Sequence, residues 1–396
     1  MSLTLQDIYE STKSKYRLNL ITPLHTLKQV MNWVYIGEDI TTFDYLNGGE
    51  LVITTGLCIH NSKELYDFIH ALIQHECCGL IINIGGYLKP KNITSDIRQL
   101  CVKNDFALFT MPWEISFQAI TKDYYNRIFE DNQTDTAITE SFLSILRQDQ
   151  DFENSILLLD DYQFTAPESY CMCVLNYRSS IDEATTLSQT EEWQKQLLYS
   201  IDNLLHDDSL KYHVMIYKNT IVFICCDSDL QLIRKTMNQI LSHLKIIRPR
   251  FDCRIGIGSL THHLADIAVS YKRACAALTM AEYHKLSLYT FEEMGFFRLL
   301  LSVHDQALLD SYLDEYLGSL IAYDKQHRSN YLDTLYQYLL SDGSIQAIAA
   351  AMFCHRNTVN YRVRNLKEML DCDLDDMKVR FNYMVAFCVK EYLEIL

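Results

Sequence analysis

Short apolar runs alternate with amphipathic segments in the first third of the chain, and this alternation is the strongest constraint on the fold. Three apolar runs are separated by two segments of helical periodicity, at 51–54, 62–75, 79–84, 94–103 and 106–110. Because alternating strands and helices build βαβ units, the strands are expected to lie mostly parallel in one sheet. The sequence therefore predicts an α/β domain over residues 1–128.

In the middle of the chain, the apolar and amphipathic runs predict a second domain with a different order of strands and helices. Strands and helices follow one another in the order βαββαβα, at 170–177, 191–206, 211–217, 220–226, 229–246, 252–258 and 264–284. This order is that of the split βαβ, or ferredoxin-like, fold. We therefore expect a ferredoxin-like α+β domain over residues 166–292, with a tight turn at Lys218–Asn219.

Between these two regions, residues 129–165 are polar and have helical periodicity. A single apolar stripe is formed by Phe142, Ile145 and Leu146. A polar helix with one apolar stripe packs that stripe against a partner surface. We interpret the segment as a helical connector or a dimerisation helix.

Residues 293–396 have helical periodicity and no convincing strand pattern, so this region is predicted to be all-α. Inside it, the stretch 344–370 predicts a helix-turn-helix. Ser344 is a favoured N-cap for a short Ala-rich helix, and a turn at 353–355 leads into a second helix. That helix carries one apolar stripe, which is expected to be buried, at Val359, Val363, Leu366 and Leu370.

The opposite face of the second helix carries side chains suited to DNA. They are Arg356, Asn357, Thr358, Asn360, Tyr361 and Arg364. Asn pairs bidentately with adenine and Arg with guanine, and Thr358 can donate to a phosphate at the helix N-terminus. Lys367 lies further along and is expected to contact only the DNA backbone. The alternative interpretation is a solvated helical hairpin that binds nothing.

The net charge of −16 excludes a protein that coats nucleic acid by its overall charge. A local basic face is still available, because the stretch 355–367 holds four Lys or Arg residues and no acid. One helix-turn-helix buries little surface, and paired half-sites raise both affinity and specificity. We therefore expect the protein to bind double-stranded DNA as a homodimer or a higher oligomer.

The sequence lacks the common signatures of catalysis and metal binding. It contains no G-x-S-x-G, no H-E-x-x-H and no P-loop motif. Its 13 Cys form no C-x-x-C pair, and His262–His263 is interpreted as a helix entry rather than a metal pair. A leader-like N-terminus and a run of about 18 apolar residues are also missing. We expect a cytoplasmic protein that is not an enzyme and has no cofactor, no metal and no membrane contact.

A candidate effector site lies at one edge of the first predicted sheet. If its strands are parallel, their carboxyl ends meet at the edge where such sheets tend to bind ligands. The segments that leave this edge supply glycines, a hydroxyl, an indole and a carboxylate, from Thr55, Gly56, Gly85, Gly86, Trp113 and Glu114. The alternative is that these are only tight βα turns, which are rich in Gly in any case.

Several stretches resemble the PucR/CdaR family of bacterial regulators. Within residues 329–396, DGSIQAIAAAMFCHRNTVNYRVRNLKEML is similar to the helix-turn-helix of that family and also to the Fis type. The similar stretches of the first domain are 32–36, 46–56, 79–86 and 111–114. In the middle domain, 254–259 and 268–282 resemble a degenerate GGDEF fold.

This resemblance implies a transcription regulator that senses a small metabolite of a catabolic pathway, such as purine catabolism, and changes DNA binding or recruitment of RNA polymerase. An active diguanylate cyclase carries GG-[DE]-E-F on its central hairpin, whereas residues 217–220 here are Tyr-Lys-Asn-Thr. The glycines that admit GTP and the metal-binding carboxylate are missing, so cyclase activity is not expected. The alternatives are a nucleotide-handling enzyme or a signalling adaptor built on the GGDEF-like domain.

Overall fold

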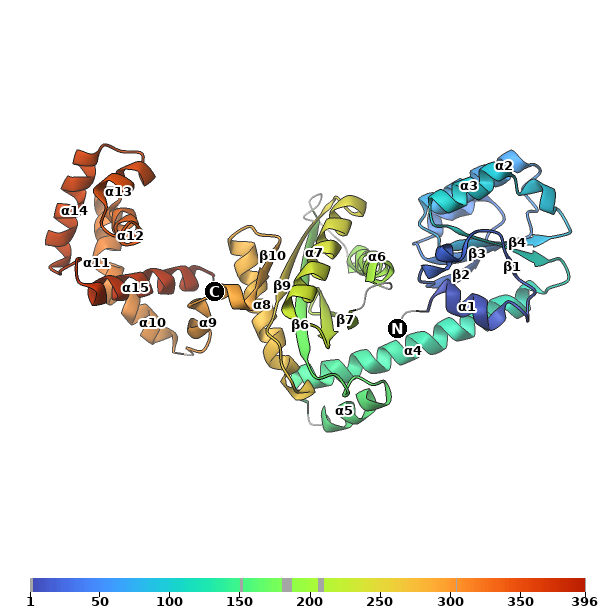
Figure 1. The fold of residues 1–396 in the computed structure, drawn as a ribbon, viewed down its shortest axis with the longest axis horizontal. Helices are drawn as coiled ribbons and strands as arrows, with labels where there is room; N and C mark the ends of the chain where they lie inside the picture. Colours follow the sequence, from blue (N-terminus) through green and yellow to red (C-terminus); the bar gives the residue numbers. More distant parts are fainter. Residues whose placement is uncertain (1–2, 150–151, 180–186, 206–209, 304, 396) are drawn as a thin grey trace. The chain divides into compact units, whose positions relative to one another are not determined.

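The computed structural model describes residues 3–149, 152–179, 187–205, 210–303 and 305–395. The chain divides into two compact units, residues 1–290 and 291–396 (Figure 1). Residues 150–151 of the expected connector and His206 of the expected helix 191–206 lie outside the described residues.

The first domain is built on a mostly parallel sheet, as the sequence predicts. Its strands are β1 (Asn19–Leu20), β2 (Trp33–Ile36), β3 (Glu50–Thr54), β4 (Gly79–Ile84) and β5 (Ala107–Pro112). Their order is β1-β5-β4-β3-β2, in which β2 to β5 are parallel and β1 is antiparallel to β5. The short strands β1 and β2 were not predicted from the apolar runs.

Helices cover both faces of this sheet. Helices α2 (Ser62–Gln74) and α3 (Ser95–Lys103) pack on one face, and α1 (Leu5–Thr12) and the start of α4 (Phe117–Arg147) pack on the other. Successive residues of β3 serve opposite cores, since side chains alternate along a strand. The 3-10 turns of this domain are Leu24–Lys28, Ile40–Tyr45 and Pro90–Asn92.

Helix α4 runs through the boundary that the sequence suggested near residue 128. Its first half contributes Ile120 and Tyr124 to the core of the first domain, and its second half contributes Phe142 and Ile145 to the core of the next. The stripe interpreted as a connector or dimerisation surface is therefore covered by the chain's own second sheet and by α5 (Phe152–Asp161).

The second sheet has the expected succession of elements with one addition. These are β6 (Tyr170–Ser179), α6 (Leu187–Leu205), β7 (Lys211–Tyr217), β8 (Thr220–Cys226), α7 (Leu230–Ile247), β9 (Phe251–Ile257), the 3-10 turn Leu264–Asp266, α8 (Ile267–Tyr283) and the unpredicted β10 (Leu288–Thr290). The strand order is β10-β9-β6-β8-β7, antiparallel except for the pair β9 and β10. Helices α6 and α7 pack on one face, and α4 and α8 on the other.

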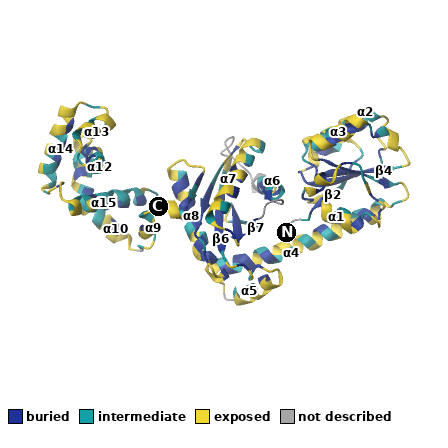
Figure 2. Ribbon diagram, in the orientation of Figure 1, coloured by how far each residue is buried: buried dark blue, intermediate teal, exposed yellow. Residues whose placement is uncertain are grey.

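The second unit is helical throughout its described residues, 291–303 and 305–395, in agreement with the prediction. Its elements are the turn Phe291–Met294, α9 (Phe297–Leu300), α10 (Gln306–Leu313), the π-helical turn Asp314–Gly318, α11 (Ser319–His327), α12 (Tyr331–Leu340), α13 (Ile345–Ala351), α14 (Arg356–Leu370) and α15 (Met377–Ile395). Figure 2 shows buried residues gathered on the sheets of the first unit, while the helices of the second unit carry long exposed faces.

Gly256 is required for the contact between β9 and α8. A Cβ atom at this position would lie 2.1 Å from the carbonyl oxygen of Ala274 and 2.3 Å from the amide nitrogen of Leu278. Both neighbours are backbone atoms of α8, so the clash cannot be relieved by a change of rotamer. The Gly256→Ala substitution should therefore destabilise the first unit by about 1–3 kcal/mol, the usual range for overpacking.

Thermal and urea unfolding of the full chain, followed by circular dichroism, measure this effect. Gly318→Ala is the matched control, because the nearest atom to a Cβ there is 3.5 Å away. The control should change stability by less than about 0.5 kcal/mol or raise it. Equal stability of the two variants would contradict the tight packing of α8 on β9.

Candidate nucleic-acid interface

A side-chain N-cap begins each of the two helices of the helix-turn-helix. The Ser344 hydroxyl accepts a hydrogen bond of 3.4 Å from the Ala347 amide, which confirms the predicted N-cap of α13. At the start of α14, Nδ1 of His355 accepts one of 3.2 Å from the Asn357 amide. The second cap was missed because His is not among the residues that commonly cap helices. Between the helices, Phe353 takes a left-handed conformation and leaves 97% of its side chain exposed.

Packing fixes which way α14 faces. Val359, Val363 and Leu366 are buried in the same core as Ile348 of α13, as the stripe predicts, whereas Leu370 is half-buried. A polar contact adds to this packing, because the Asn365 side chain donates a hydrogen bond of 3.0 Å to the Tyr331 hydroxyl on α12. The rotation of α14 about its axis is therefore set by apolar and polar contacts together.

The six predicted DNA-contacting residues all lie on the exposed side of α14. They are Arg356, Asn357, Thr358, Asn360, Tyr361 and Arg364. The first three occupy the first turn, where the helix dipole favours an anion, while the Asn357 and Thr358 amides are already bonded to His355. In the described part of the chain no ion pair involves Arg356, so its guanidinium is available to a ligand.

Two of the four basic side chains in the stretch 355–367 lie beside acidic side chains of the same domain. Lys367 lies 2.8 Å from the Asp375 carboxylate and over the Tyr338 ring, and the hydrogen bond to Asp375 raises the pKa of the lysine. Arg364 lies 3.8 Å from Glu368, one turn further along. The sequence predicts that Lys367 contacts only the DNA backbone, but in the structure its side chain already has a partner within the domain.

The six residues of the expected effector site meet at the carboxyl edge of the first sheet, since β3, β4 and β5 are parallel. Several of their groups are already engaged. The ring of Trp113 covers Gly86, where a Cβ would lie 2.3 Å from it, and Glu114 lies 3.1 Å from Arg17. Thr55, Gly56 and Gly85 complete the edge, where they follow β3 and β4.

Glu38 follows β2, and its carboxylate lies at the turn after β3, a role that the sequence reasoning missed. Its carboxylate accepts hydrogen bonds from the Thr54 hydroxyl at 3.0 Å, the Thr55 amide at 2.8 Å and the Leu57 amide at 3.2 Å. Two of the backbone amides that could have received a ligand are therefore satisfied internally. A lone Glu between two short elements gives no sequence signal for this role.

The hairpin between β7 and β8 closes in the tight turn that the sequence predicts. Lys218 and Asn219 have φ values of 48° and 62°, as in a type I′ turn. Of the adjacent histidines, His262 contacts the Glu168 carbonyl oxygen at 3.0 Å through Nδ1. Among the described residues, no group of three or more His, Cys, Asp or Glu side chains could hold a metal ion. No helix of that part of the chain is long and apolar enough to cross a membrane.

Comparison with known proteins identifies related domains along most of the chain. The purine catabolism regulatory protein-like family matches residues 7–128, a GGDEF-like domain matches 159–280, and the PucR C-terminal helix-turn-helix domain matches 331–389.

Two curated relatives come from Bacillus subtilis. The proline-responsive transcriptional activator PutR is 27% identical over 180 residues, 44% of this chain and 44% of PutR. The DNA-binding transcriptional activator AdeR is 24% identical over 147 residues, 36% of this chain and 35% of AdeR. The matches thus span less than half the length of either relative.

Among solved structures, a regulator of polyketide synthase expression from Bifidobacterium adolescentis has 15% sequence identity and a TM-score of 0.29, covering 65% of this chain and 99% of that one.

By its three matched domains, the chain belongs to the PucR family: a PucR-type N-terminal domain, a GGDEF-like middle domain and a PucR-type C-terminal helix-turn-helix domain.

Proposed function

We propose that this protein is a sequence-specific DNA-binding transcription regulator that reads the major groove with α14. The observation that carries the proposal is the orientation of α14, whose buried stripe turns Arg356, Asn357 and Arg364 outward. A short helix with Asn and Arg near its N-terminus fits the major groove and its hydrogen-bonding edges. The two curated relatives, both transcriptional activators by name, support this proposal.

The regulator responds to a small metabolite of a catabolic pathway. PutR is proline-responsive by name, and the family description refers to purine catabolism, so members of the family differ in what they sense. The response is proposed to change DNA binding or the recruitment of RNA polymerase. A homodimer or higher oligomer in the cytoplasm, on paired half-sites, is the form that would give a short helix sufficient affinity.

The GGDEF-like domain is proposed to be ferredoxin-like and not catalytic. Without β10, its strand order β9-β6-β8-β7 is the fourth, first, third and second strand in sequence, as in that fold. The turn Lys218–Asn219 replaces the glycines and carboxylate of an active cyclase. Purified protein with GTP and Mg²⁺ should give no cyclic dinucleotide by chromatography. A product that disappeared on mutation of this hairpin would support the nucleotide-handling enzyme instead.

The proposal for α14 predicts which substitutions abolish sequence recognition. Arg364→Ala or Asn357→Ala should weaken binding to the preferred duplex by about 1–3 kcal/mol, roughly 5- to 150-fold, and relax the base preference. The preferred duplex is obtained by selection from a randomised pool with the full-length protein. Fluorescence anisotropy then measures binding to this duplex and to its base-substituted versions.

Lys325→Ala removes an exposed positive charge from α11 and serves as the control, with circular dichroism as a check on folding. It should leave affinity and preference unchanged. The proposal fails if folded Arg356→Ala, Asn357→Ala and Arg364→Ala proteins all keep wild-type affinity and preference.

The ion pair of Lys367 predicts a different outcome for that residue. Because its ammonium is held by Asp375, Lys367→Ala should leave the salt dependence of DNA binding unchanged. As a surface pair it should cost less than about 1 kcal/mol of stability. Arg356→Ala should instead lower the slope of log K against log salt by about one. If both variants lowered the slope equally, Lys367 would leave Asp375 to contact a phosphate.

A further inference from the structure

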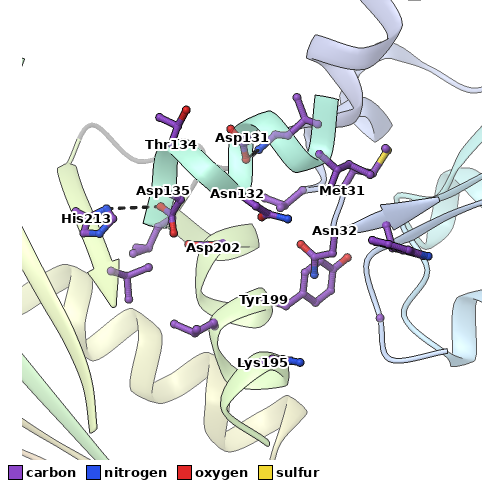
Figure 3. Close-up of a pocket in the computed structure, with 18 of the residues that line it drawn as sticks. Met31, Asn32, Asp131, Asn132, Thr134, Asp135, Lys195, Tyr199, Asp202 and His213 are labelled. Carbon is purple, nitrogen blue, oxygen red and sulfur yellow. Dashed lines mark hydrogen bonds and ion pairs between the residues drawn. The ribbon is translucent and has the colours of Figure 1, made fainter. Parts of the chain in front are cut away.

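A large cleft lies within the first unit, at the end of the first sheet opposite its carboxyl edge. Its volume is about 1270 Å³, above the 300–1,000 Å³ typical of small-molecule sites. The cleft is bounded by the amino end of β3, the middle of α4, α6 and β7 (Figure 3). Its apolar lining is supplied by Val30, Met31, Ile128, Ile138, Leu198, Leu205 and Leu210.

Specific contacts hold the two domains around this cleft. The Arg248 guanidinium donates hydrogen bonds of 2.8 and 2.5 Å to the Glu76 carboxylate. The Val30 amide donates one of 2.8 Å to the Asn203 side chain. Gly49 lies so close to the ring of Tyr199 that a Cβ atom would be 2.6 Å from it. The walls of the cleft therefore come from both domains and are joined by polar and packing contacts.

One wall of the cleft presents two carboxylates, Asp131 and Asp135, four residues apart on α4 (Figure 3). Asp131 accepts a hydrogen bond of 3.3 Å from the Leu3 amide. Asp135 lies 3.8 Å from Nδ1 of His213, which is too far for a hydrogen bond. Over the described ranges, neither carboxylate forms an ion pair with a Lys or Arg side chain.

The neighbouring histidine cannot neutralise these acids. His213 is 95% buried, Nε2 is hydrogen-bonded to the Thr139 hydroxyl at 2.9 Å, and burial lowers its pKa to about 3. The imidazole is therefore uncharged at neutral pH. Burial also raises the pKa of Asp131 and Asp135, since desolvation disfavours a carboxylate. A cation that entered the cleft would stabilise the charged form of both carboxylates, of which Asp135 keeps 54% of its side chain exposed.

A positive group faces the cleft from α6. Lys195 is exposed and lines the cleft, and it forms no ion pair with another described residue (Figure 3). Asp202 lies on the same helix and also lines the cleft. The cleft thus combines an apolar lining with carboxylates on α4 and α6 and with two ammonium groups. These belong to Lys195 on α6 and to Lys211 on β7, which donates a hydrogen bond of 2.7 Å to the Gln163 carbonyl oxygen.

We propose that this cleft is the effector site and that it binds a small metabolite through an alkylammonium group held by Asp131 and Asp135. The inference rests on the proposed function, because it names the site and chemistry of the effector. Two kinds of metabolite share this chemistry, α-amino acids and polyamines. An amino acid carries a carboxylate that a polyamine lacks, and the lysines that line the cleft are Lys195 and Lys211.

Ligand binding to the full-length protein, in the absence of DNA, tests the proposal. The probes are the twenty protein α-amino acids, putrescine and spermidine, each at millimolar concentration and each paired with a counterpart in which every amine is N-acetylated. At least one amine should raise the Tm, since a ligand that binds the folded state stabilises it. Its N-acetylated counterpart should bind at least tenfold more weakly by calorimetry. Absence of binding by every amine overturns the proposal.

Substitutions then locate the site. Asp131→Asn and Asp135→Asn should each weaken binding of the amine at least tenfold. Glu130→Gln is the matched control, because Glu130 is an exposed acid of the same helix that does not line the cleft. Binding of an amino acid but not of putrescine or spermidine, or the reverse, distinguishes the two sources. Each variant should keep the wild-type circular dichroism spectrum.

The remaining outcomes separate this inference from the proposed function. If the Asp131→Asn/Asp135→Asn double variant still binds the amine, the cleft is not the site. If Trp113→Ala then abolishes amine binding, the ligand lies at the carboxyl edge of the sheet instead. Binding in the cleft that leaves DNA affinity and transcription unchanged supports the site but contradicts the proposed effector response. If the protein binds DNA specifically but binds no amine, the proposed effector site in the cleft is wrong and the proposed DNA-binding function stands.

Discussion

The arrangement of the first unit depends on one helix that is buried in two cores. Helix α4 supplies Ile120 and Tyr124 to the core of the parallel sheet and Phe142 and Ile145 to the core of the antiparallel sheet. A continuous helix transmits position along its axis, because each turn is fixed by hydrogen bonds to the next. Its middle, between the two buried segments, is the stretch that presents Asp131 and Asp135 to the cleft.

The sequence predicts those parts of the fold that depend on local periodicity. The strands of 79–84 and 211–226 and the stripe of α14 appear where apolar spacing puts them. The prediction fails where pairing comes from elsewhere in the chain. Strand β10 is three residues long and exists because it pairs with β9. The polar surface of α4 suggested a separate connector, because nothing in its periodicity shows that two different cores cover its ends.

The two candidate sites also differ in how far the sequence alone predicts them. The outward face of α14 could be predicted, since a buried stripe on one side of a helix determines what lies on the other. The partners of Lys367 and of the Thr55 amide could not, because Asp375 and Glu38 reach them through turns that leave no pattern. The cleft could not be predicted either, since its lining comes from separate stretches between residues 3 and 214.

A cleft shared by two domains is also better suited to signalling than a site within one sheet. A ligand shifts a conformational equilibrium only by the difference between its affinities for the two states. At the carboxyl edge, Thr55, Gly85 and Trp113 directly follow strands of one sheet and would keep their spacing if the domains moved. A ligand in the cleft is surrounded by residues of both domains, such as Met31 and Leu198, and would lose one set of contacts on such movement. A tenfold change in DNA affinity requires about 1.4 kcal/mol of coupling, and the loss of one charged contact, at about 1.5–3 kcal/mol, is sufficient to supply it.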